Sequence, residues 1–377
     1  MKQTLRDFLC PQPKSKIKAG DGQLKGAYNF YTSSQIQSKF YHSATYTQPA
    51  LIFGTGGMAS VHYCNEPFST STDCLVMYGR LGAPLELIYY YLRSNMHLLQ
   101  DGFKGAGLQH ISKDYILNIN INMPAPSLQE QITHQMRLID AMINGKKQQI
   151  LSFDEAVKSR FIELFGDPAS NSPKWDTGRL GDYMTTLTDF SANGSYALLD
   201  SQVVMYDEPH YAIMVRTTDL ETGDLKNGVK YIDQKAYELL GKSKLFGGEM
   251  IMNKIGSAGK IYLMPHIETP ASLGRNAFMF RFDQRVNIVF LYALLTSEYG
   301  TAEIQQHVRG AVTKTITKES TRSIRIIVPP IELQEQFAAF VEQTDKSKYY
   351  SSLSFRYCQA AANTYRQEWM TCRTSDF

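Results

Sequence analysis

The chain contains one segment twice, and this repeat constrains its fold more than any other feature. Residues 105–131 match residues 310–336 at a constant offset of 205 positions, and both copies carry a Gly-Ala pair, an Ile-x-Lys triplet, a proline and a Leu-Gln-Glu-Gln tetrad. Further upstream, residues 5–7 (Leu-Arg-Asp) correspond to residues 180–182 (Leu-Gly-Asp). Self-similarity of this kind indicates a duplicated architecture. With 377 residues, the chain is long enough for two or three domains.

Each copy reads as a variable mixed region, a short strand, a proline and a helix. The strands are expected at residues 119–123 and 324–328, where β-branched residues precede a proline that must end the strand. The Leu-Gln-Glu-Gln tetrad then begins a helix in each copy, and Ser127 and Glu130 have the spacing of a capping box. Because the frame repeats while the middle segments differ, we expect two similar domains with different surfaces.

The helix after the first strand has heptad periodicity. We expect it to run from Leu128 to Leu164, which corresponds to about 55 Å at about 1.5 Å per residue. Its apolar residues occupy two positions of a seven-residue repeat, namely Ile132, Met136, Ile139, Ile143, Ile150, Phe153, Val157 and Leu164. This spacing is typical of a coiled coil.

The corresponding second helix is expected from Leu333 to about Trp369. Its apolar residues begin as Leu333, Phe337, Phe340 and Val341 and continue less regularly as Tyr350, Leu353, Tyr357, Ala361 and Tyr365. We expect the two helices to pair antiparallel, to separate the two domains, and to relate them by an approximate two-fold axis.

Composition excludes several classes of protein. Apolar residues make up 43% and charged residues 20% of the chain, which is ordinary for a folded protein. The longest apolar run, residues 288–295, is far shorter than the roughly 20 residues of a membrane span, and no signal peptide is evident, so we expect a cytoplasmic protein with no membrane contact. The five cysteines, which form no C-x-x-C pair and are expected to be reduced, are Cys10, Cys64, Cys74, Cys358 and Cys372. The net charge of +3 is only weakly favourable for nucleic acid.

Two short motifs raise the alternative of an enzyme, and each departs from its catalytic pattern. Residues 65–68 (Asn-Glu-Pro-Phe) differ at Glu66 from the Asn-Pro-Pro-Phe motif of amino-methyltransferases, which binds the amino group of a flipped base. Residues 256–260 (Gly-Ser-Ala-Gly-Lys) are similar to a phosphate loop, but Lys254 and Ile261 occupy positions where that motif requires glycine and Ser or Thr. We interpret residues 256–260 either as a hairpin that approaches a DNA phosphate closely or as a plain turn.

A third motif has the residue types of a metal-dependent nuclease. Asp219 and residues 224–226 (Asp-Leu-Lys) could supply carboxylates and a lysine, but residues 222–224 (Thr-Gly-Asp) are typical of a turn, so we interpret this stretch as a surface loop. The eight histidines show no metal-ligand spacing, and no metal site is predicted.

Taken in order and twice over, the repeated features resemble the specificity subunits of type I restriction-modification systems. These features are a variable domain, a Gly-x5-Ile-(Ser/Thr)-Lys segment, a strand, a proline, a Leu-Gln-Glu-Gln tetrad and a long helix. Residues 159–168, followed by Trp175 and residues 180–182, are similar to the junction that opens the second target-recognition domain of that family. The first copy departs from the family's glycine hairpin, because residues 53–58 lack the cation that Lys254 supplies in the second.

This resemblance implies a mixed α/β (α+β) fold with two target-recognition domains in pseudo-two-fold repeat, separated by two long helices that form an antiparallel coiled coil. The corresponding boundaries are 1–123 for the first target-recognition domain, 124–170 for the first spacer helix, 171–330 for the second domain and 331–377 for the second spacer helix. The implied function is recognition of a two-part, asymmetric sequence in double-stranded DNA. The chain itself is expected to be non-catalytic and to hold no cofactor.

The partners that the resemblance implies are two methyltransferase subunits, which carry S-adenosylmethionine, and restriction-motor subunits, which use ATP and Mg²⁺. The helix residues that pair in the coiled coil or bind these partners are expected to be Ile132, Met136, Ile139, Ile143, Ile150, Phe153, Val157, Leu164, Leu333, Phe337, Phe340 and Val341. The alternatives are a stand-alone DNA methyltransferase or nuclease, and a coiled-coil scaffold that binds only protein.

The side chains that could read DNA are cations and amides, because Arg and Lys suit guanine edges and phosphates while Asn and Gln suit adenine. The candidates in the first domain are Lys16, Lys18, Lys25, Lys39, Arg80, Lys104 and Gln109. Those in the second domain are Arg216, Lys254, Arg275, Asn276, Arg309 and Lys314. For each of them the alternative is a solvated surface residue.

Overall fold

Two long helices carry the heptad pattern. In the computed structural model, which describes residues 3–371 and the side chains through residue 365, α5 (Pro126–Phe165) has 40 residues and α12 (Ile331–Thr371) has 41. Both helices begin two residues earlier than predicted. Proline is well suited to the first position of a helix, so α5 begins at Pro126. The predicted capping box is therefore wrong, because Ser127 lies inside the first turn and does not cap it.

The chain divides into two compact units, and each helix contributes one half to each unit. Unit 1 contains residues 1–150 and 350–377, and unit 2 contains residues 151–349. The domain boundaries predicted from the sequence stay a prediction.

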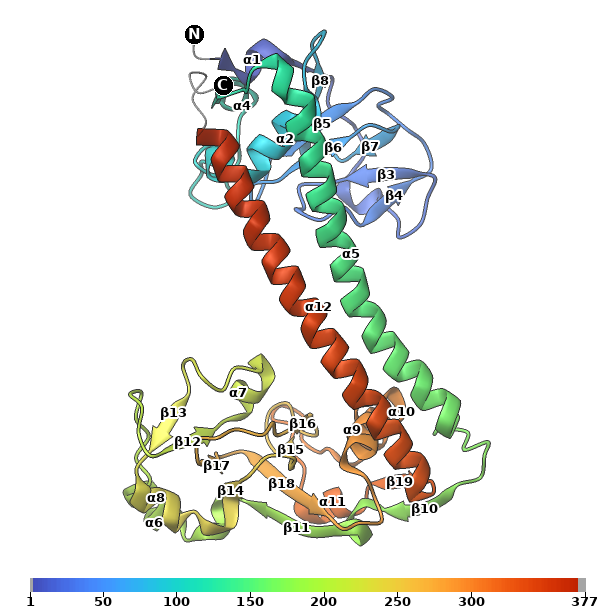
Figure 1. The fold of residues 1–377 in the computed structure, drawn as a ribbon, viewed down its shortest axis with the longest axis vertical. Helices are drawn as coiled ribbons and strands as arrows, with labels where there is room; N and C mark the ends of the chain where they lie inside the picture. Colours follow the sequence, from blue (N-terminus) through green and yellow to red (C-terminus); the bar gives the residue numbers. More distant parts are fainter. Residues whose placement is uncertain (1–2, 372–377) are drawn as a thin grey trace. The chain divides into compact units, whose positions relative to one another are not determined.

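Unit 1 is built on two small sheets (Figure 1). The four-stranded antiparallel sheet has the order β2 (Leu9–Pro11), β8 (Cys74–Gly79), β5 (Ala50–Gly54) and β6 (Val61–Cys64). The three-stranded sheet has the order β4 (Lys39–Tyr41), β3 (Tyr28–Tyr31) and β7 (Phe68–Thr70), with β3 and β7 parallel. A two-residue pairing joins β1 (Gln3–Thr4) to β9 (Asn120–Ile121).

Short helices complete unit 1. They are α1 (Leu5–Phe8), the 3-10 turn η1 (Ala19–Asp21), α2 (Leu85–Ser94), α3 (His97–Gln100) and α4 (Lys113–Leu117). The face of α2 that carries Leu87 and Ile88 packs on the four-stranded sheet, where Leu51 and Met77 are fully buried. A fully buried aliphatic side chain stabilises the fold by about 1.5–3 kcal/mol relative to exposure, so this face anchors α2 to the sheet.

Unit 2 repeats this plan with additional helices (Figure 1). Its first sheet has the order β11 (Met184–Asp189), β18 (Ala277–Phe282), β15 (Met250–Asn253) and β16 (Ile261–Leu263). Its second sheet has the order β13 (Lys230–Ile232), β12 (Ala212–Val215), β17 (Ala271–Leu273) and β14 (Lys244–Leu245). The pairing of β10 (Asp176–Arg179) with β19 (Arg325–Val328) matches that of β1 with β9.

The helices of unit 2 follow the same order at the end of the copy. Those that match the first copy are η2 (Leu180–Tyr183), α9 (Ile288–Thr296), α10 (Glu298–His307) and α11 (Lys318–Arg322). The segment between β11 and β15 adds η3 (Phe190–Asn193), α6 (Tyr196–Gln202), α7 (Thr217–Thr222), α8 (Gln234–Leu239) and η4 (Gly241–Ser243). In the second copy this middle segment therefore forms helices, and residues of η3, α6 and α8 pack with residues of the second sheet.

The repeated residues near the start of each copy form the same turn. Leu5 and Leu180 are fully buried, and the carboxylates of Asp7 and Asp182 accept hydrogen bonds from the backbone N–H of Thr4 (2.8 Å) and Arg179 (3.1 Å). One residue thus anchors the turn in the core while the other satisfies a backbone donor, which explains why Leu-x-Asp occurs in both copies.

The repeated tetrad has a similar local role. The amide of Gln129 donates to the carbonyl of Pro124 (3.0 Å), and the amide of Gln334 donates to the carbonyl of Pro329 (2.7 Å). In unit 2 the oxygen of Gln334 also accepts from the backbone N–H of Asn287 (2.8 Å). The glutamine therefore ties the start of each long helix to the chain that precedes it.

The two long helices pack against each other antiparallel within each unit. In unit 2, Phe161 contacts Phe337 (5.5 Å between ring centroids), and Asp154 pairs with Lys348. Residue numbers therefore decrease along α5 in the direction in which they increase along α12. In unit 1, Met136 of α5 is fully buried, and Tyr365 of α12 packs against the same core. The predicted antiparallel coiled coil is confirmed.

The predicted seam of the second helix is wrong at Tyr350 and Tyr357, although Tyr365 packs against the core of unit 1. Tyr350 and Tyr357 are 69% and 67% exposed, whereas the small residues Thr344, Ser351 and Ala362 are buried. Small side chains allow helices to approach closely, but they add little to a hydrophobic pattern. The sequence reading therefore followed these two large aromatic residues, which lie on the solvent side.

Candidate nucleic-acid interface

A pair of loops projects from the four-stranded sheet of unit 1. The loop between β5 and β6 contacts the hairpin that spans residues 104–110: Gly57 donates its N–H to the carbonyl of Gln109 (3.3 Å), and Ile111 donates to that of Thr55 (3.2 Å). Gly105 has a φ of 140°, a region that disfavours other residues, and a Cβ there would lie 2.7 Å from the carbonyl oxygen of Leu108. This glycine of the repeat is needed for the tight hairpin.

Unit 2 forms the same pair of loops with the same hydrogen bonds. Gly256 donates to the carbonyl of Lys314 (2.9 Å), and Ile316 donates to that of Lys254 (3.0 Å). Gly310 has a φ of 104° and, like its counterpart, leaves no room for a Cβ. We call these two regions paired loop 1 (residues 54–59 and 104–110) and paired loop 2 (residues 253–259 and 309–315).

The paired loops share a backbone but differ in their side chains. Paired loop 1 presents the candidates Lys104 and Gln109, and paired loop 2 presents Arg309 and Lys314. All four residues are exposed. The structure therefore brings predicted readers together at equivalent places, with a different pair of side chains in each unit.

A second group of predicted readers lines a pocket of about 320 Å³ in unit 2. Arg275, Asn276 and Lys254 lie at this pocket beside Phe190 and Tyr196. The guanidinium of Arg275 lies 5.2 Å and 5.4 Å from the centroids of the Phe190 and Tyr196 rings and donates a hydrogen bond to the carboxylate of Asp200 (2.9 Å), so two rings and an ion pair orient this cation. Asn276 has a φ of 67°, which asparagine tolerates better than most residues. An aromatic wall with a cation and an amide is suited to a nucleotide base.

Lys254 is held by a carboxylate that the sequence reading missed. The Asp189 side chain, 9% exposed, accepts hydrogen bonds from the ammonium groups of Lys254 (2.9 Å) and Lys318 (2.8 Å). Burial alone would raise the pKa of the Asp189 carboxyl, but the hydrogen bonds from Lys318 and Lys254 outweigh it and lower the pKa below its ordinary value. Both ammonium groups also lie about 6 Å from the Phe278 ring centroid (5.8 and 6.0 Å). We call this arrangement the Asp189 ion triad.

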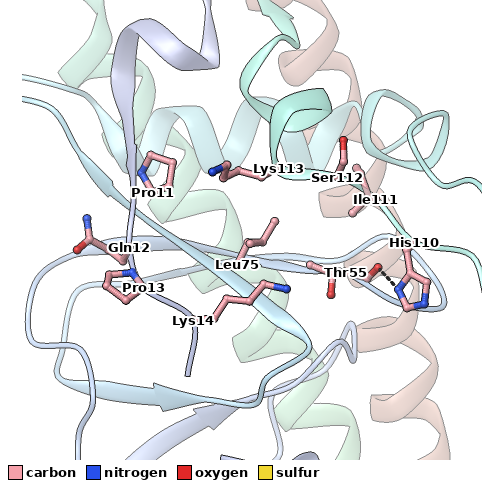
Figure 2. Close-up of a pocket in the computed structure, with 10 residues that line it drawn as sticks. All are labelled: Pro11, Gln12, Pro13, Lys14, Thr55, Leu75, His110, Ile111, Ser112 and Lys113. Carbon is pink, nitrogen blue, oxygen red and sulfur yellow. Dashed lines mark hydrogen bonds between the residues drawn. The ribbon is translucent and has the colours of Figure 1, made fainter. Parts of the chain in front are cut away.

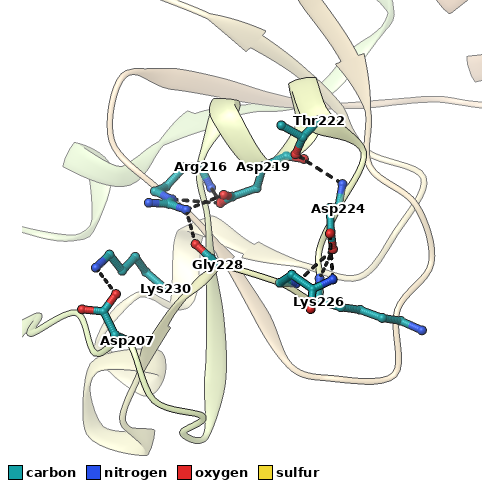
Figure 3. Close-up of polar contacts among 9 residues, drawn as sticks. Asp207, Arg216, Asp219, Thr222, Asp224, Lys226, Gly228 and Lys230 are labelled. Atoms are coloured by element: carbon teal, nitrogen blue, oxygen red, sulfur yellow. Dashed lines mark hydrogen bonds and ion pairs between the residues drawn. The ribbon is translucent and has the colours of Figure 1, made fainter. Parts of the chain in front are cut away.

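Arg216 lies apart from these groups, in a network that Figure 3 shows. Its guanidinium donates to both carboxylate oxygens of the buried Asp219 (3.0 and 2.6 Å) and to the carbonyl of Gly228 (2.8 Å). Both partners belong to unit 2, so the contacts of this arginine stabilise a loop of the fold.

The remaining candidates of the first copy are spread over unit 1. Lys16, Lys18 and Lys25 are exposed. Lys39 donates to the carbonyl of Ala19 (2.8 Å), and Arg80 donates to that of Arg6 (3.1 Å). The structure does not bring these five residues into one site.

Comparisons with known proteins agree on one family. Residues 3–152 match the family model of the type I restriction modification DNA specificity domain. The chain is 22% identical over 266 residues to the MjaVIII specificity subunit of Methanocaldococcus jannaschii, and 24% identical over 143 residues to the EcoDI specificity subunit of Escherichia coli. These alignments cover 68% and 38% of this chain, and 63% and 32% of the relatives. Residues 3–152 therefore match the type I restriction modification DNA specificity domain, and the relatives that the chain matches are type I specificity subunits.

A solved structure extends the match of fold over the whole chain. The type I restriction-modification S subunit from M. genitalium superposes with a TM-score of 0.65 at 14% identity, covering 99% of this chain and 96% of that one. A similarity at this identity supports the fold alone. In the part of the chain that the structure describes, no helix combines the length and apolar character needed to cross a membrane.

Residues of the motifs that suggested an enzyme make packing contacts and an ion pair within the fold. Phe68 of the Asn-Glu-Pro-Phe segment is fully buried and stacks on Tyr46 (5.2 Å between ring centroids). Lys260 of the residue 256–260 loop pairs with Glu221, and β16 follows this loop where a phosphate-binding motif would begin a helix.

The nuclease-like triplet forms the surface loop that was predicted. The carboxylate of Asp224 accepts hydrogen bonds from the backbone N–H groups of Lys226 (2.8 Å) and Asn227 (3.0 Å), which define a turn (Figure 3). The hydrogen bond from the Asn227 side chain, followed by those from the backbone, lowers the pKa of Asp224. The carboxylate oxygens of Asp224 thus accept hydrogen bonds from residues of the same loop.

Two further features were missed for different reasons. Asp189 lies 65 residues before Lys254 in the chain, and no local pattern pairs them. Leu108 and Val312, which are 81% and 97% exposed in the two hairpins, were overlooked because they are apolar. The glycines of the repeat mark both hairpins and could have pointed to the residues at their tips.

Proposed function

We propose that this chain is a type I specificity subunit, reads a two-part, asymmetric DNA sequence through its two paired loops and performs no chemistry itself. The observation that carries this proposal is the duplicated loop pair, in which the backbone hydrogen bonds are the same but the exposed side chains differ. Base edges in the major groove are distinguished by side-chain donors and acceptors. Two paired loops with the same backbone and different exposed side chains therefore favour recognition of two different half-sites.

The side chains of each unit are suited to different parts of this task. Gln109 has the amide that pairs with adenine, and Arg275 has the planar fork that pairs with guanine. Arg309 and Lys314 carry charge that would hold phosphates and set the position of the duplex. Partial immobilisation of Arg275 between two aromatic rings reduces the entropy lost on binding.

The long helices are the proposed docking surface for two methyltransferase subunits. Large apolar side chains lie exposed along them, including Leu138 and Met142 on α5 and Leu353 and Tyr357 on α12. Exposed apolar residues that gather on one element are typical of protein interfaces. In this proposal S-adenosylmethionine is bound by the methyltransferase subunits, and ATP and Mg²⁺ by restriction-motor subunits.

Sequencing of methylated bases in a host that expresses this chain with its methyltransferase partner tests the proposal. We expect a split motif with two different halves. Replacing residues 1–123 with those of another family member should change one half only, and a change in both halves would contradict separate reading by the two units.

Assays of the purified chain separate the alternatives. With S-adenosylmethionine or Mg²⁺ and DNA, the chain alone should show no turnover, whereas methylation or cleavage would favour an enzyme. Loss of all sequence dependence in DNA binding, even with the methyltransferase present, would favour a protein scaffold.

Helix length provides a separate test. Inserting four residues within positions 141–153 would lengthen α5 by about 6 Å. We expect the spacer between half-sites to change while the sequence of each half-site is kept. Successive major-groove faces lie about 34 Å apart along the duplex, and each unit must still contact a major groove. An unchanged spacer would show that the helix does not set the separation.

A further inference from the structure

The position that the Asp189 ion triad occupies in unit 2 is an open pocket in unit 1. Matching hydrogen bonds of the paired loops make Thr55 the counterpart of Lys254 and Lys113 the counterpart of Lys318. Both units therefore have a lysine at the first residue of the short helix after the hairpin. Among the residues whose side chains are described, this lysine binds a carboxylate only in unit 2.

The strand register identifies what replaces the carboxylate. Asp189 pairs with Phe278 across β11 and β18. In unit 1, β5 places Leu75 at the position of Phe278, and the N–H of Gln12 donates to the carbonyl of Val76 (2.8 Å), so the next residue, Pro13, takes the place of Asp189. A proline offers no charge, so the lysine has lost its internal partner.

The resulting pocket has a volume of about 660 Å³ and is lined by two lysines, by neutral polar side chains and by prolines and aliphatic side chains. Lys113 lies above Leu75 and Lys14 below it in the view of Figure 2, and His110 and Ser112 belong to the polar part of the wall. No aspartate or glutamate lines it. Among the residues whose side chains are described, neither lysine forms an ion pair.

The donors of the pocket match a phosphate group. Two ammonium groups supply charge, and the Ser112 hydroxyl can donate a further hydrogen bond. Nδ1 of His110 donates a hydrogen bond to the Thr55 carbonyl (3.1 Å), which directs the imidazole ring from paired loop 1 into the wall of the pocket. Because Thr55 and His110 belong both to the pocket and to paired loop 1, a duplex that contacts the loop passes beside the pocket.

We propose that this pocket binds a backbone phosphate of the DNA half-site read by unit 1, with Lys14 and Lys113 as its cationic ligands. The inference rests on the proposed function. In unit 2 the equivalent charges are neutralised by Asp189 and stabilise the fold, so the two copies use one position of the frame for different purposes. Unit 1 consequently gains a contact that is independent of base sequence.

The salt dependence of DNA binding tests this assignment. The full chain and a Lys14→Gln/Lys113→Gln variant are titrated with a duplex of random sequence at several salt concentrations. Each lost phosphate contact should make the slope of log K against log salt shallower by about 0.9. Both lysines bind the same phosphate in this proposal, so the double variant should change the slope by about 0.9. The matched control, Lys147→Gln, removes an equally exposed lysine on α5 and should leave the slope unchanged.

A second variant tests the comparison between the copies. Pro13→Asp introduces the carboxylate of unit 2 at its equivalent position and should reduce the slope in the same direction without removing either lysine. Circular dichroism and thermal unfolding establish that the variants are folded. An unchanged slope in the folded double variant overturns the pocket assignment while leaving the proposed DNA reading intact.

Inorganic phosphate separates failure of the pocket from failure of the function. Millimolar phosphate should protect unit 1 of the wild type against thermal unfolding more than it protects the Lys14→Gln/Lys113→Gln variant. Phosphate protection without any DNA binding would overturn both the DNA assignment and the proposed function, and would leave a small-anion site. DNA binding with no difference between the two proteins in either assay would overturn the pocket alone.

Discussion

Removing the charge of Asp189 tests whether the ion triad stabilises unit 2. Asp189→Asn keeps the shape of the side chain but leaves Lys254 and Lys318 without their carboxylate. Breaking a buried ion pair from one side costs about 3–5 kcal/mol. The lysine side chains are 19% and 33% exposed and can turn towards water, so we expect a loss near the lower end, about 3 kcal/mol.

Urea unfolding followed by tryptophan fluorescence measures this loss. In a Trp369→Phe background the signal comes from Trp175, whose indole N–H donates to the carbonyl of Phe165 (2.9 Å) in unit 2. Glu221→Gln is the control, because it breaks an ion pair of the same unit in which both side chains are about half exposed, and such pairs contribute about 1 kcal/mol or less.

The pH dependence gives an independent check with a fixed sign. The folded-state pKa of Asp189 is lowered, so its contribution is complete above the unfolded-state value of about 3.9 and is lost as the pH falls through the lowered pKa. The difference in stability between wild type and Asp189→Asn should therefore shrink below about pH 4. A variant that loses no more stability than Glu221→Gln at pH 7 would refute the reasoning.

Three further changes test the interface and the packing of the helices. Arg275→Gln should weaken binding of the cognate DNA by about 1–3 kcal/mol and relax one half-site only, as measured by methylation mapping. The control Arg285→Gln changes an exposed arginine outside the pocket and should leave the motif unchanged. An unaltered motif in both variants would exclude base reading by Arg275. Gly310→Ala should disrupt paired loop 2 and abolish recognition of its half-site, because a Cβ would lie 2.1 Å from a backbone oxygen. The control Gly107→Ala in paired loop 1 should be tolerated in the same mapping, because a Cβ there would meet no atom within 4 Å. Phe337→Ala should lower the free energy of unfolding of unit 2 by about 3–5 kcal/mol in the urea assay, since the ring is fully buried against α5, and a loss below 1 kcal/mol would contradict that packing.

Local features of both copies were predictable from the sequence. The repeat located the strands that precede Pro124 and Pro329, the starts of the long helices to within two residues, and the glycine of each hairpin. The coiled-coil pattern of α5 was legible because large aliphatic residues mark its buried positions. These features depend on backbone conformation and periodicity, which neighbouring residues encode.

The tertiary structure decided how the same frame is used in each copy. Strand register places Asp189 between two lysines in unit 2 and Pro13 at that position in unit 1, and no spacing in the chain reports either arrangement. The packing of α12 through Thr344, Ser351 and Ala362 was equally hidden, because small side chains carry a weak hydrophobic signal. Periodicity determined where the helices and strands form, whereas the contacts between residues distant in sequence determined which charges are neutralised within the fold and which are exposed to a ligand.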